Sequence, residues 1–169
     1  MPTYIALLRA VNVGGTGKLP MAELRAMCEA AGFEDVRTYI ASGNVVLRSA
    51  LNAKRVQAAL EQCLADYAGK PVGVIVRTPA EMARALAAQP FAHAAPNRAL
   101  VIFLDAPPPA DALAAVKHRN GEQIALGERE IYVHYGDGMA DSKLVIPAAK
   151  AGTARNLNTV AKLIEMAGG

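Results

Sequence analysis

The sequence of 169 residues contains no tryptophan, and aromatic residues make up only 5% of it. The core is therefore expected to consist of alanine, leucine, valine and isoleucine side chains. The sequence has no run of lysine or arginine and no interleaving of basic with aromatic residues, unlike a typical dedicated nucleic-acid-binding protein. No apolar stretch reaches the roughly 20 residues that a membrane-spanning helix needs, so we predict no membrane partner.

Cysteine and histidine are also scarce. Cys28 and Cys63 lie within apolar helical patterns and form no CxxC pair, which indicates reduced core residues in a reducing compartment. The three histidines form neither an HxxxH nor an HExxH pair, so we predict no metal site. The N-terminal apolar run breaks at Arg9, too early for a signal peptide, and we expect a cytoplasmic protein.

The composition that remains is globular, with 53% hydrophobic residues. Lysine and arginine number 18 against 15 aspartate and glutamate residues, which gives a formal net charge of +3. This small excess permits an anionic ligand but does not require one. The length suits one ordinary domain or two small ones that share a core.

Apolar periodicity and turn residues predict a β-α-β-β-α-β order in the first half of the chain. Gly32 stands where a C-terminal glycine cap belongs, and the residues between the second and third strands favour a tight reversal, so these strands form a hairpin. The predicted elements are strands at 3–11, 36–40, 45–48 and 72–76, and helices that begin after Pro20 and after Asn52.

A similar order restarts at residue 99, after a helical segment that opens with the capping box Thr78-Pro79-Ala80-Glu81. We therefore expect an α+β fold of two tandem ferredoxin-like halves with mostly antiparallel sheets. The halves share element order and not residues, so a duplication is only suggested. The predicted regions are the first half 1–77, the helical connector 78–97 and the second half 98–169, with strands at 99–104, 123–126 and 130–135, a helix near 110–118 and a last helix from Thr153.

In this fold the exit of the first strand and the hairpin after the second strand share one edge of the sheet. Glycines there would let backbone N–H groups approach a ligand, and the helix that begins near Pro20 would add positive potential. We predict an anion-binding rim, with ordinary connecting turns as the alternative. The rim residues are Asn12, Gly14, Gly15, Thr16, Lys18, Ser42, Gly43 and Asn44.

The loop at 14–18 follows a strand and precedes a helix, as a P-loop does. The GxxxxGK[ST] pattern, however, would need glycine where Asn12 stands and serine or threonine where Leu19 stands. The hydroxyl that binds magnesium is therefore missing, and the sequence argues against a P-loop nucleoside triphosphatase.

The last helix is expected to open with several poor helix formers. With a start at Thr153, its polar side chains at i, i+3, i+4 and i+7 would form one stripe opposite an apolar stripe. This stripe is a second candidate for ligand contacts, with end-capping and loop contacts as the alternative. The four positions of the stripe are those of Arg155, Asn158, Thr159 and Lys162, and Asn156 is a further polar residue at the start of the same helix.

Three stretches together resemble a known family of bacterial proteins, domain of unknown function 1697. They read YIALLRAVNVGG at 4–15, MAELRAMCEAAGFEDVRTYIASGNV at 21–45 and TARNLNTVAKLIEMA at 153–167. The resemblance supplies no reaction and no cofactor, but it implies a role for Arg9 beside the polar residues already named. Ala10 stands where the family often has glycine, and Leu157 where it often has tryptophan. The second difference removes a large aromatic side chain, so base stacking is not expected at that position.

These observations favour a binding protein for an anionic ligand, which is a phosphate-bearing small molecule, a nucleotide or a nucleic acid. A structural or protein-interaction module is one alternative, and a small enzyme that acts by positioning and backbone donors is another. No nucleophile, base and orienting group occur at a recognisable spacing, so catalysis is neither predicted nor excluded. We predict no cofactor.

Overall fold

The computed structural model describes residues 1–9, 19–40, 43–91, 95–96, 98–135 and 142–168. Within these residues the chain forms strands, α-helices and two short 3-10 helices, so the predicted mixed α/β fold is confirmed. The elements, in chain order, are β1 (Thr3–Leu8), α1 (Met21–Ala30), β2 (Glu34–Tyr39), β3 (Asn44–Arg48), α2 (Ala53–Ala68), β4 (Val74–Arg77), α3 (Pro79–Ala87), β5 (Ala99–Phe103), η1 (Ala112–Ala115), β6 (Gln123–Leu126), β7 (Glu130–His134), η3 (Pro147–Ala149), β8 (Thr153–Asn156) and α4 (Leu157–Met166).

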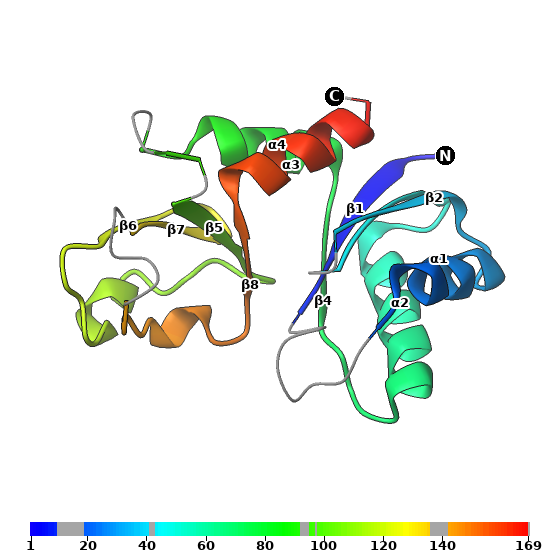
Figure 1. Cartoon of the computed structure of the whole chain (residues 1–169), viewed down its shortest axis with the longest axis horizontal. Coiled ribbons are helices and arrows are strands. Elements are labelled where there is room, and N and C mark those ends of the chain that lie inside the picture. The colour runs from blue at the N-terminus through cyan, green and yellow to red at the C-terminus, as the bar shows by residue number, and fades with distance from the viewer. Residues whose placement is uncertain (10–18, 41–42, 92–94, 97, 136–141, 169) are drawn as a thin grey trace. The chain divides into compact units, whose positions relative to one another are not determined.

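The strands form two four-stranded sheets. Sheet A has the strand order β2-β3-β1-β4, and sheet B has the order β6-β7-β5-β8 (Figure 1). Neighbouring strands are antiparallel in both sheets, as expected. Each sheet belongs to its own compact unit: unit 1 comprises Met1–Met82 with Leu163–Gly169, and unit 2 comprises Ala83–Lys162.

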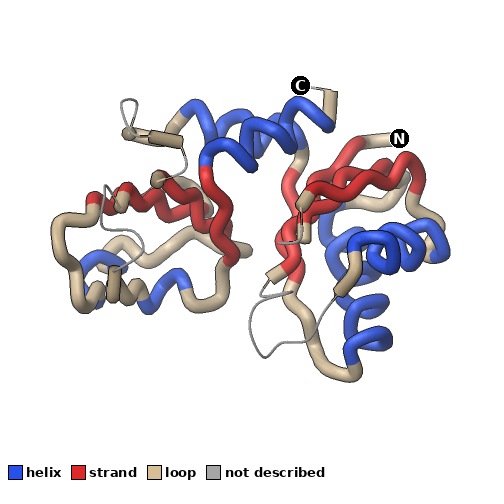
Figure 2. Tube along the Cα trace, viewed as in Figure 1, coloured by secondary structure: helices blue, strands red, loops and turns tan. Residues whose placement is uncertain are grey.

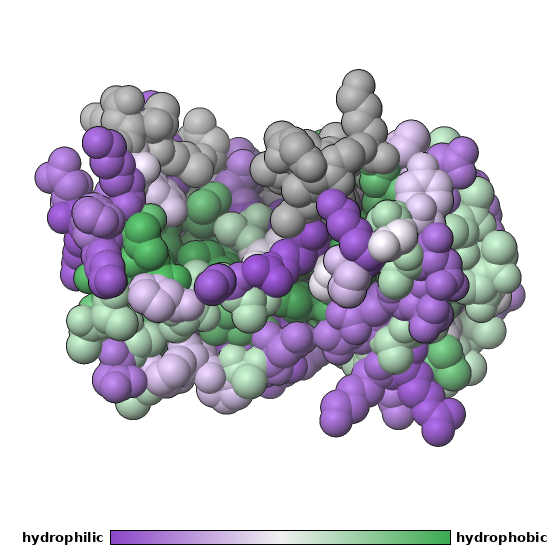
Figure 3. Space-filling model, turned by 90° about the horizontal axis from the view of Figure 1, so that it is seen from below, coloured by the Kyte–Doolittle hydropathy of each residue, from purple (hydrophilic) through white to green (hydrophobic). Residues whose placement is uncertain are grey.

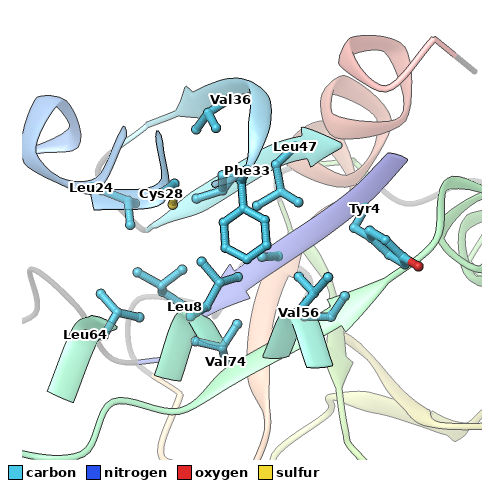
Figure 4. Packing of buried hydrophobic residues seen from close by; sticks show 14 of the residues in the cluster. Tyr4, Leu8, Leu24, Cys28, Phe33, Val36, Leu47, Val56, Leu64 and Val74 are labelled. Atoms are coloured by element: carbon cyan, nitrogen blue, oxygen red, sulfur yellow. The ribbon is translucent and has the colours of Figure 1, made fainter. Parts of the chain in front are cut away.

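Helices α1 and α2 cover one face of sheet A, as Figures 1 and 2 show. Every second residue of β1, namely Tyr4, Ala6 and Leu8, points toward these helices and joins their apolar side chains in one buried cluster. The ring of Phe33 lies among side chains from the strands and from both helices (Figure 4). Burial of this apolar surface contributes a stabilising free energy of roughly 25 cal/mol per Å² and so holds the helices against the sheet.

The opposite face of sheet A is buried as well. Ile5, Leu7 and Ile75 point to this face, and each is at most 2% exposed. The sequence of β1 is therefore an unbroken apolar run and not an alternation. The last turn of α4 belongs to unit 1, where the Met166 carbonyl oxygen accepts a hydrogen bond from the guanidinium of Arg37 on β2.

In unit 2, one face of sheet B packs against a smaller apolar cluster that includes residues near η1 and η3. The predicted helix near residues 110–118 is wrong, because only Ala112–Ala115 form a helix, and it is of the 3-10 type. Val116 is already extended, with a ψ of 134°, and Lys117 forms an antiparallel bridge with Val145. Pairing with a distant segment thus ends the helix within one turn.

The predicted start of the last helix at Thr153 is also wrong. Thr153 pairs with Phe103, and Arg155 pairs with Val101, so Thr153–Asn156 form the edge strand β8 of sheet B. The poor helix formers of this segment suit a strand and a cap. The helix begins at Leu157.

The two sheets carry a buried arginine at the same register position. In sheet A, Ile5 pairs with Arg77 on the edge strand β4, and in sheet B, Val101 pairs with Arg155 on the edge strand β8. Each arginine donates a hydrogen bond from its NH1 to the carbonyl oxygen of the residue before it. The similarity between the two halves thus extends from strand order to one particular side chain.

A helix-capping residue follows the arginine in each half. Thr78 Oγ1 accepts from the N–H of Glu81 at 3.1 Å, and Glu81 accepts from the N–H of Thr78 at 2.9 Å, which confirms the capping box. Asn156 Oδ1 accepts from the N–H of Thr159 at 2.9 Å. In both halves, therefore, the residue after the buried arginine caps the N-terminus of the helix that follows the edge strand, α3 after β4 and α4 after β8.

Glu122 ties two segments of unit 2 together. Its carboxylate accepts hydrogen bonds from Ser142 Oγ, at 2.6 Å, and from the N–H of Asn120, while Ser142 Oγ accepts from the N–H of Leu144. The hydrogen bond from Ser142, followed by that from the Asn120 backbone, lowers the pKa of Glu122 below its ordinary value. The ionised carboxylate is therefore the form that the folded state prefers.

This preference predicts acid sensitivity. A glutamate whose pKa is lower in the folded state contributes stability above its unfolded pKa, about 4.3, and loses it as the pH falls through the folded pKa. We expect the urea midpoint of the wild type to fall more steeply than that of Glu122→Gln as the pH goes from about 6 to about 3. Parallel pH profiles of the two proteins would contradict this role of Glu122.

Candidate functional site

Three chain segments meet at one end of sheet A, where β1 ends, the β2–β3 hairpin turns and β4 begins. The N–H of Leu8 donates to the Gly43 carbonyl oxygen at 2.8 Å, and the N–H of Arg9 donates to the Gly73 carbonyl oxygen at 2.9 Å. Backbone hydrogen bonds therefore join residues that are far apart in the sequence. We call this end of the sheet, comprising Leu8, Arg9, Gly43, Asn44 and Gly73, the hairpin edge.

Helix α1 begins on the side of unit 1 that holds the hairpin edge. Strand β2 runs toward this edge and starts shortly after α1 ends, so the helix must run away from the edge. Pro20, the N-cap residue, gives no side-chain hydrogen bond, and its carbonyl oxygen accepts from the N–H groups of Glu23 and Leu24. The N-terminal partial positive charge of α1 therefore lies on the side of the edge.

The shape of the hairpin depends on Asn44 and Gly43. Asn44 is fully buried, and its Nδ2 donates to the Tyr39 carbonyl oxygen at 2.9 Å. Gly43 has a φ of 89°, a conformation that glycine adopts without steric cost, and its N–H donates to the Ile40 carbonyl oxygen at 3.3 Å. The structure thus gives Asn44 a definite role in holding the turn.

Helix α2 fixes the start of β4. Gln57 Nε2 donates to the Val74 carbonyl oxygen at 2.7 Å, and the Val74 N–H donates to Glu61 Oε2 at 3.2 Å. These side chains satisfy the backbone groups of an edge strand that would otherwise attract another strand. They also hold Gly73, whose carbonyl oxygen accepts from Arg9.

Arg9 is the exposed cation of the hairpin edge. A Cβ atom placed on Gly73 would lie 3.5 Å from Arg9 Cδ and 3.6 Å from Arg9 Cβ, so the stem of the arginine passes over this glycine. Since no side chain separates the stem from the backbone of Gly73, the arginine stem stays close to the end of the sheet, and the residue as a whole is exposed.

The structure brings together the predicted residues Arg9, Gly43 and Asn44. It also places both described flanks of the glycine loop, Arg9 and Leu19, in unit 1. Six predicted rim residues lie outside the described residues, namely Asn12, Gly14, Gly15, Thr16, Lys18 and Ser42.

The second predicted group, around Arg155, lies in unit 2 and does not form the expected stripe. Arg155 is 6% exposed, and its guanidinium donates to Thr153 Oγ1 at 2.6 Å and to the Ala154 carbonyl oxygen at 2.9 Å. Burial lowers the pKa of Arg155 to about 10, so the group remains a cation at neutral pH. Arg155 is on a strand, whereas Asn158 is exposed on α4, so the two are not neighbours on one helix.

Two other members of that group serve the start of α4. Asn156 accepts the hydrogen bond that caps the helix, and Thr159 supplies the N–H and is itself buried. This agrees with the end-capping alternative for these two residues.

The sequence did not single out Arg77, Gly73 or Ile40. Arg77 is 2% exposed although it is charged, and its NH1 donates to the Val76 carbonyl oxygen at 3.2 Å. The signal was present in the sequence, because an arginine directly after a short Val-Ile-Val strand has its stem in a buried sheet. Gly73 and Ile40 gave no comparable signal.

Among the described residues, no three histidine, cysteine, aspartate or glutamate side chains are grouped so that they could hold a metal ion. The described helices are also all too short or too polar to cross a membrane.

The fold defines the class of this molecule as a mixed α/β protein with two four-stranded antiparallel sheets. The chain belongs to the family described as Protein of unknown function (DUF1697), whose model matches residues 1–132. The matched range includes the hairpin edge and ends before β8. The resemblance on which the family was expected is thereby confirmed.

Among solved structures, the chain is similar to the conserved bacterial protein SP0830 from Streptococcus pneumoniae. The two chains are 23% identical, the similarity covers 98% of each, and the TM-score is 0.79. At this identity the likeness shows a shared fold along the whole chain. No curated protein matches the sequence.

Proposed function

We propose that the hairpin edge of unit 1 binds an anionic, phosphate-bearing ligand, a nucleotide in particular. The observation that supports this proposal most directly is the pair of backbone hydrogen bonds that joins the end of β1 to the hairpin and to the start of β4. These bonds bring Arg9, Gly43 and Gly73 close together. Arg9 supplies a formal charge, and Gly43 and Gly73 have no side chains that would keep a phosphate away from the end of the sheet. The glycine loop with Asn12, Gly14, Gly15 and Lys18, and Ser42 of the hairpin, are proposed to complete the site.

The equivalent end of sheet B offers an internal contrast. There the Leu104 N–H donates to the Arg129 carbonyl oxygen at 2.9 Å, as Leu8 does to Gly43. Asp105 then stands where unit 1 has Arg9, and Glu130 stands where unit 1 has Asn44. The cation Arg9 and the neutral Asn44 are thus replaced by carboxylates, while Gly43 is replaced by the cation Arg129. The net change makes this end of sheet B less positive than that of sheet A, which supports anion binding in unit 1.

A sheet-face mode of nucleic-acid binding has no support. RNA-binding sheets of this general kind present exposed aromatic side chains on which bases stack. In sheet A, the corresponding face carries Ile5, Leu7 and Val46, which are aliphatic and fully buried. The proposed ligand is therefore one that the loops at the sheet edge bind.

Titration calorimetry of the full chain tests this proposal, with inorganic phosphate and AMP as probes at low salt. We expect Arg9→Ala to weaken the binding of both probes by about tenfold or more, since a charge-assisted hydrogen bond is lost. Arg55→Ala is the matched control, because Arg55 is exposed in the first turn of α2, at the far end of the same unit. The Arg55→Ala variant should bind both probes with the affinity of the wild type.

Two results would overturn the proposal. One is a wild-type protein that binds neither probe. The other is an equal loss of affinity in the Arg9→Ala and Arg55→Ala variants, which would show that only the net charge of the protein matters for binding. Binding through phosphate should also weaken as salt rises from about 20 mM to about 200 mM, because the edge is exposed and screened.

A protein-interaction role is the second candidate, and one observation favours it. Leu113 in η1 and Val145 in the bridge are 39% and 46% exposed. In Figure 3, hydrophobic residues gather on the visible surface of unit 2, at the left, with hydrophilic residues around them. A dimer in light scattering that dissociates on Leu113→Ser would favour this role.

We also propose that the two units are duplicated ferredoxin-like halves. Three similarities support this: the strand order, the buried arginines at one register position, and the caps that follow them. Among the described residues of unit 2, the 3-10 helix η1 lies between β5 and β6, where unit 1 has α1 between β1 and β2.

A cytoplasmic location is part of the proposal. Cys28 and Cys63 are free thiols, as is usual in a reducing compartment. Burial raises the pKa of Cys28 to about 12, so this residue stays a neutral thiol that packs as a small apolar group.

A further inference from the structure

Ile40 has an unusual conformation for its residue type. Its φ is 50°, in the left-handed region, where a β-branched side chain collides with its own backbone. Asp35 and His118 also have positive φ values, but aspartate and histidine tolerate that region better. The chain thus places a poorly suited residue at a turn position that asparagine or glycine would fill without strain.

The surrounding turn enforces this conformation. Asn44, fully buried, holds the Tyr39 carbonyl oxygen, and the N–H of Gly43 donates to the carbonyl oxygen of Ile40 itself. The carbonyl oxygen of Gly43 in turn accepts from Leu8 on β1. Strain that neighbouring contacts maintain in this way is found mainly at functional sites.

The side chain of Ile40 is 47% exposed, so the strain is not compensated by burial in the core. It stands at the end of β2, while Arg9 follows β1, and β3 lies between these strands. Two strand spacings separate them, or roughly 10 Å. An exposed apolar residue and an exposed cation therefore lie at the same sheet edge, with their backbones further apart than inorganic phosphate can span.

We infer that the ligand of the hairpin edge is an organic phosphate whose apolar body contacts Ile40 while its phosphate contacts Arg9. This inference rests on the proposed anion site and specifies its ligand class. A nucleotide has this build, with a flat base several ångströms from its phosphate, and an alkyl phosphate shares the same chemistry. Ile40 is then a specificity residue. The protein keeps isoleucine at this strained position because its side chain contacts the apolar body of the ligand.

Calorimetry with inorganic phosphate, AMP and hexyl phosphate tests the inference on the full chain. Ile40→Asn is expected to weaken AMP binding by about tenfold and to leave phosphate binding unchanged, because only the apolar contact is removed. Ile40→Leu should retain AMP affinity within about threefold. Leu51→Asn is the matched control, since Leu51 is aliphatic, 37% exposed and located between β3 and α2, at the other end of sheet A, and this variant should bind AMP like the wild type.

A thermal melt separates binding from folding. Ile40→Asn should raise the midpoint by about 2–4 °C, because asparagine relieves the strain at this φ. Weaker AMP binding by a more stable protein cannot be attributed to unfolding. A larger loss for AMP than for hexyl phosphate identifies the apolar body as a base, and the reverse identifies it as an alkyl chain.

The inference fails if Ile40→Asn binds AMP as tightly as the wild type while Arg9→Ala loses both AMP and phosphate. In that case the anion site stands and Ile40 has no part in it. If the wild type binds no probe, the proposed anion site itself fails. The two failures are therefore distinguishable.

Discussion

Gly152→Ala is expected to lower the free energy of unfolding by about 3 kcal/mol. A Cβ atom there would lie 2.6 Å from the Phe103 carbonyl oxygen and 2.7 Å from Leu104 Cδ2. The carbonyl cannot move away easily, because Phe103 pairs with Thr153, the next residue, in the β5–β8 ladder. Urea denaturation followed by circular dichroism would measure the loss.

Gly73→Ala provides the control for this substitution. Neither glycine has a positive φ, so the two changes alter the backbone freedom of the unfolded chain similarly. At position 73 the new Cβ would make only ordinary contacts with Arg9, at 3.5 and 3.6 Å. We expect a change within about 1 kcal/mol. Equal losses of unfolding free energy in Gly152→Ala and Gly73→Ala would show that the close approach of β8 to β5 does not restrict the size of the residue at position 152.

The parts of the fold that the sequence predicted well depend on contacts between residues close in the chain. Asn52 caps α2 through the N–H of Arg55 at 2.9 Å, and Gly32 has the positive φ, 95°, expected after a helix. The Thr78–Glu81 capping box also forms as expected. Such contacts are visible as short spacings because both partners lie within one helical turn.

The errors occurred where a distant partner decides the local structure. Thr153–Asn156 extend because β5 offers them a ladder, and the helix near Ala112 ends because Lys117 pairs with Val145. In the same way, the hydroxyl of Tyr132 donates to the Ala85 carbonyl oxygen at 2.8 Å, a bond that the strand pattern around Tyr132 does not indicate. Tertiary pairing overrides local propensity at such positions.

The candidate site, like the fold, was predicted from the sequence only in part. Topology led to Gly43 and Asn44 at the edge where β1 ends, because strand directions follow from the order of elements. Arg9 was expected only from the resemblance to the family. Gly73 and the strained Ile40 were missed, since neither a close approach of backbones nor a positive φ at isoleucine leaves a pattern in the sequence. These two features come from the exact way in which three strands end together.

Arg155→Ala is expected to cost about 3 kcal/mol of unfolding free energy, comparable to the effect at Gly152. The substitution would empty the space of a side chain that is 6% exposed, and it would leave the Thr153 hydroxyl and the Ala154 carbonyl without the donor that they now share. Arg84→Ala, at an exposed position on α3, should change stability by less than about 0.5 kcal/mol.

Arg155→Met separates the packing of the stem from the hydrogen bonds of the guanidinium. Methionine keeps most of the apolar stem and removes the desolvated charge, so we expect a loss of about 1 kcal/mol or less in the same urea titration. A loss as large as that of Arg155→Ala would assign the stabilisation to the guanidinium bonds. If Arg155→Ala is as stable as Arg84→Ala, the arginine is not needed for folding, and its burial at the same register position as Arg77 would require a role outside the stability of unit 2.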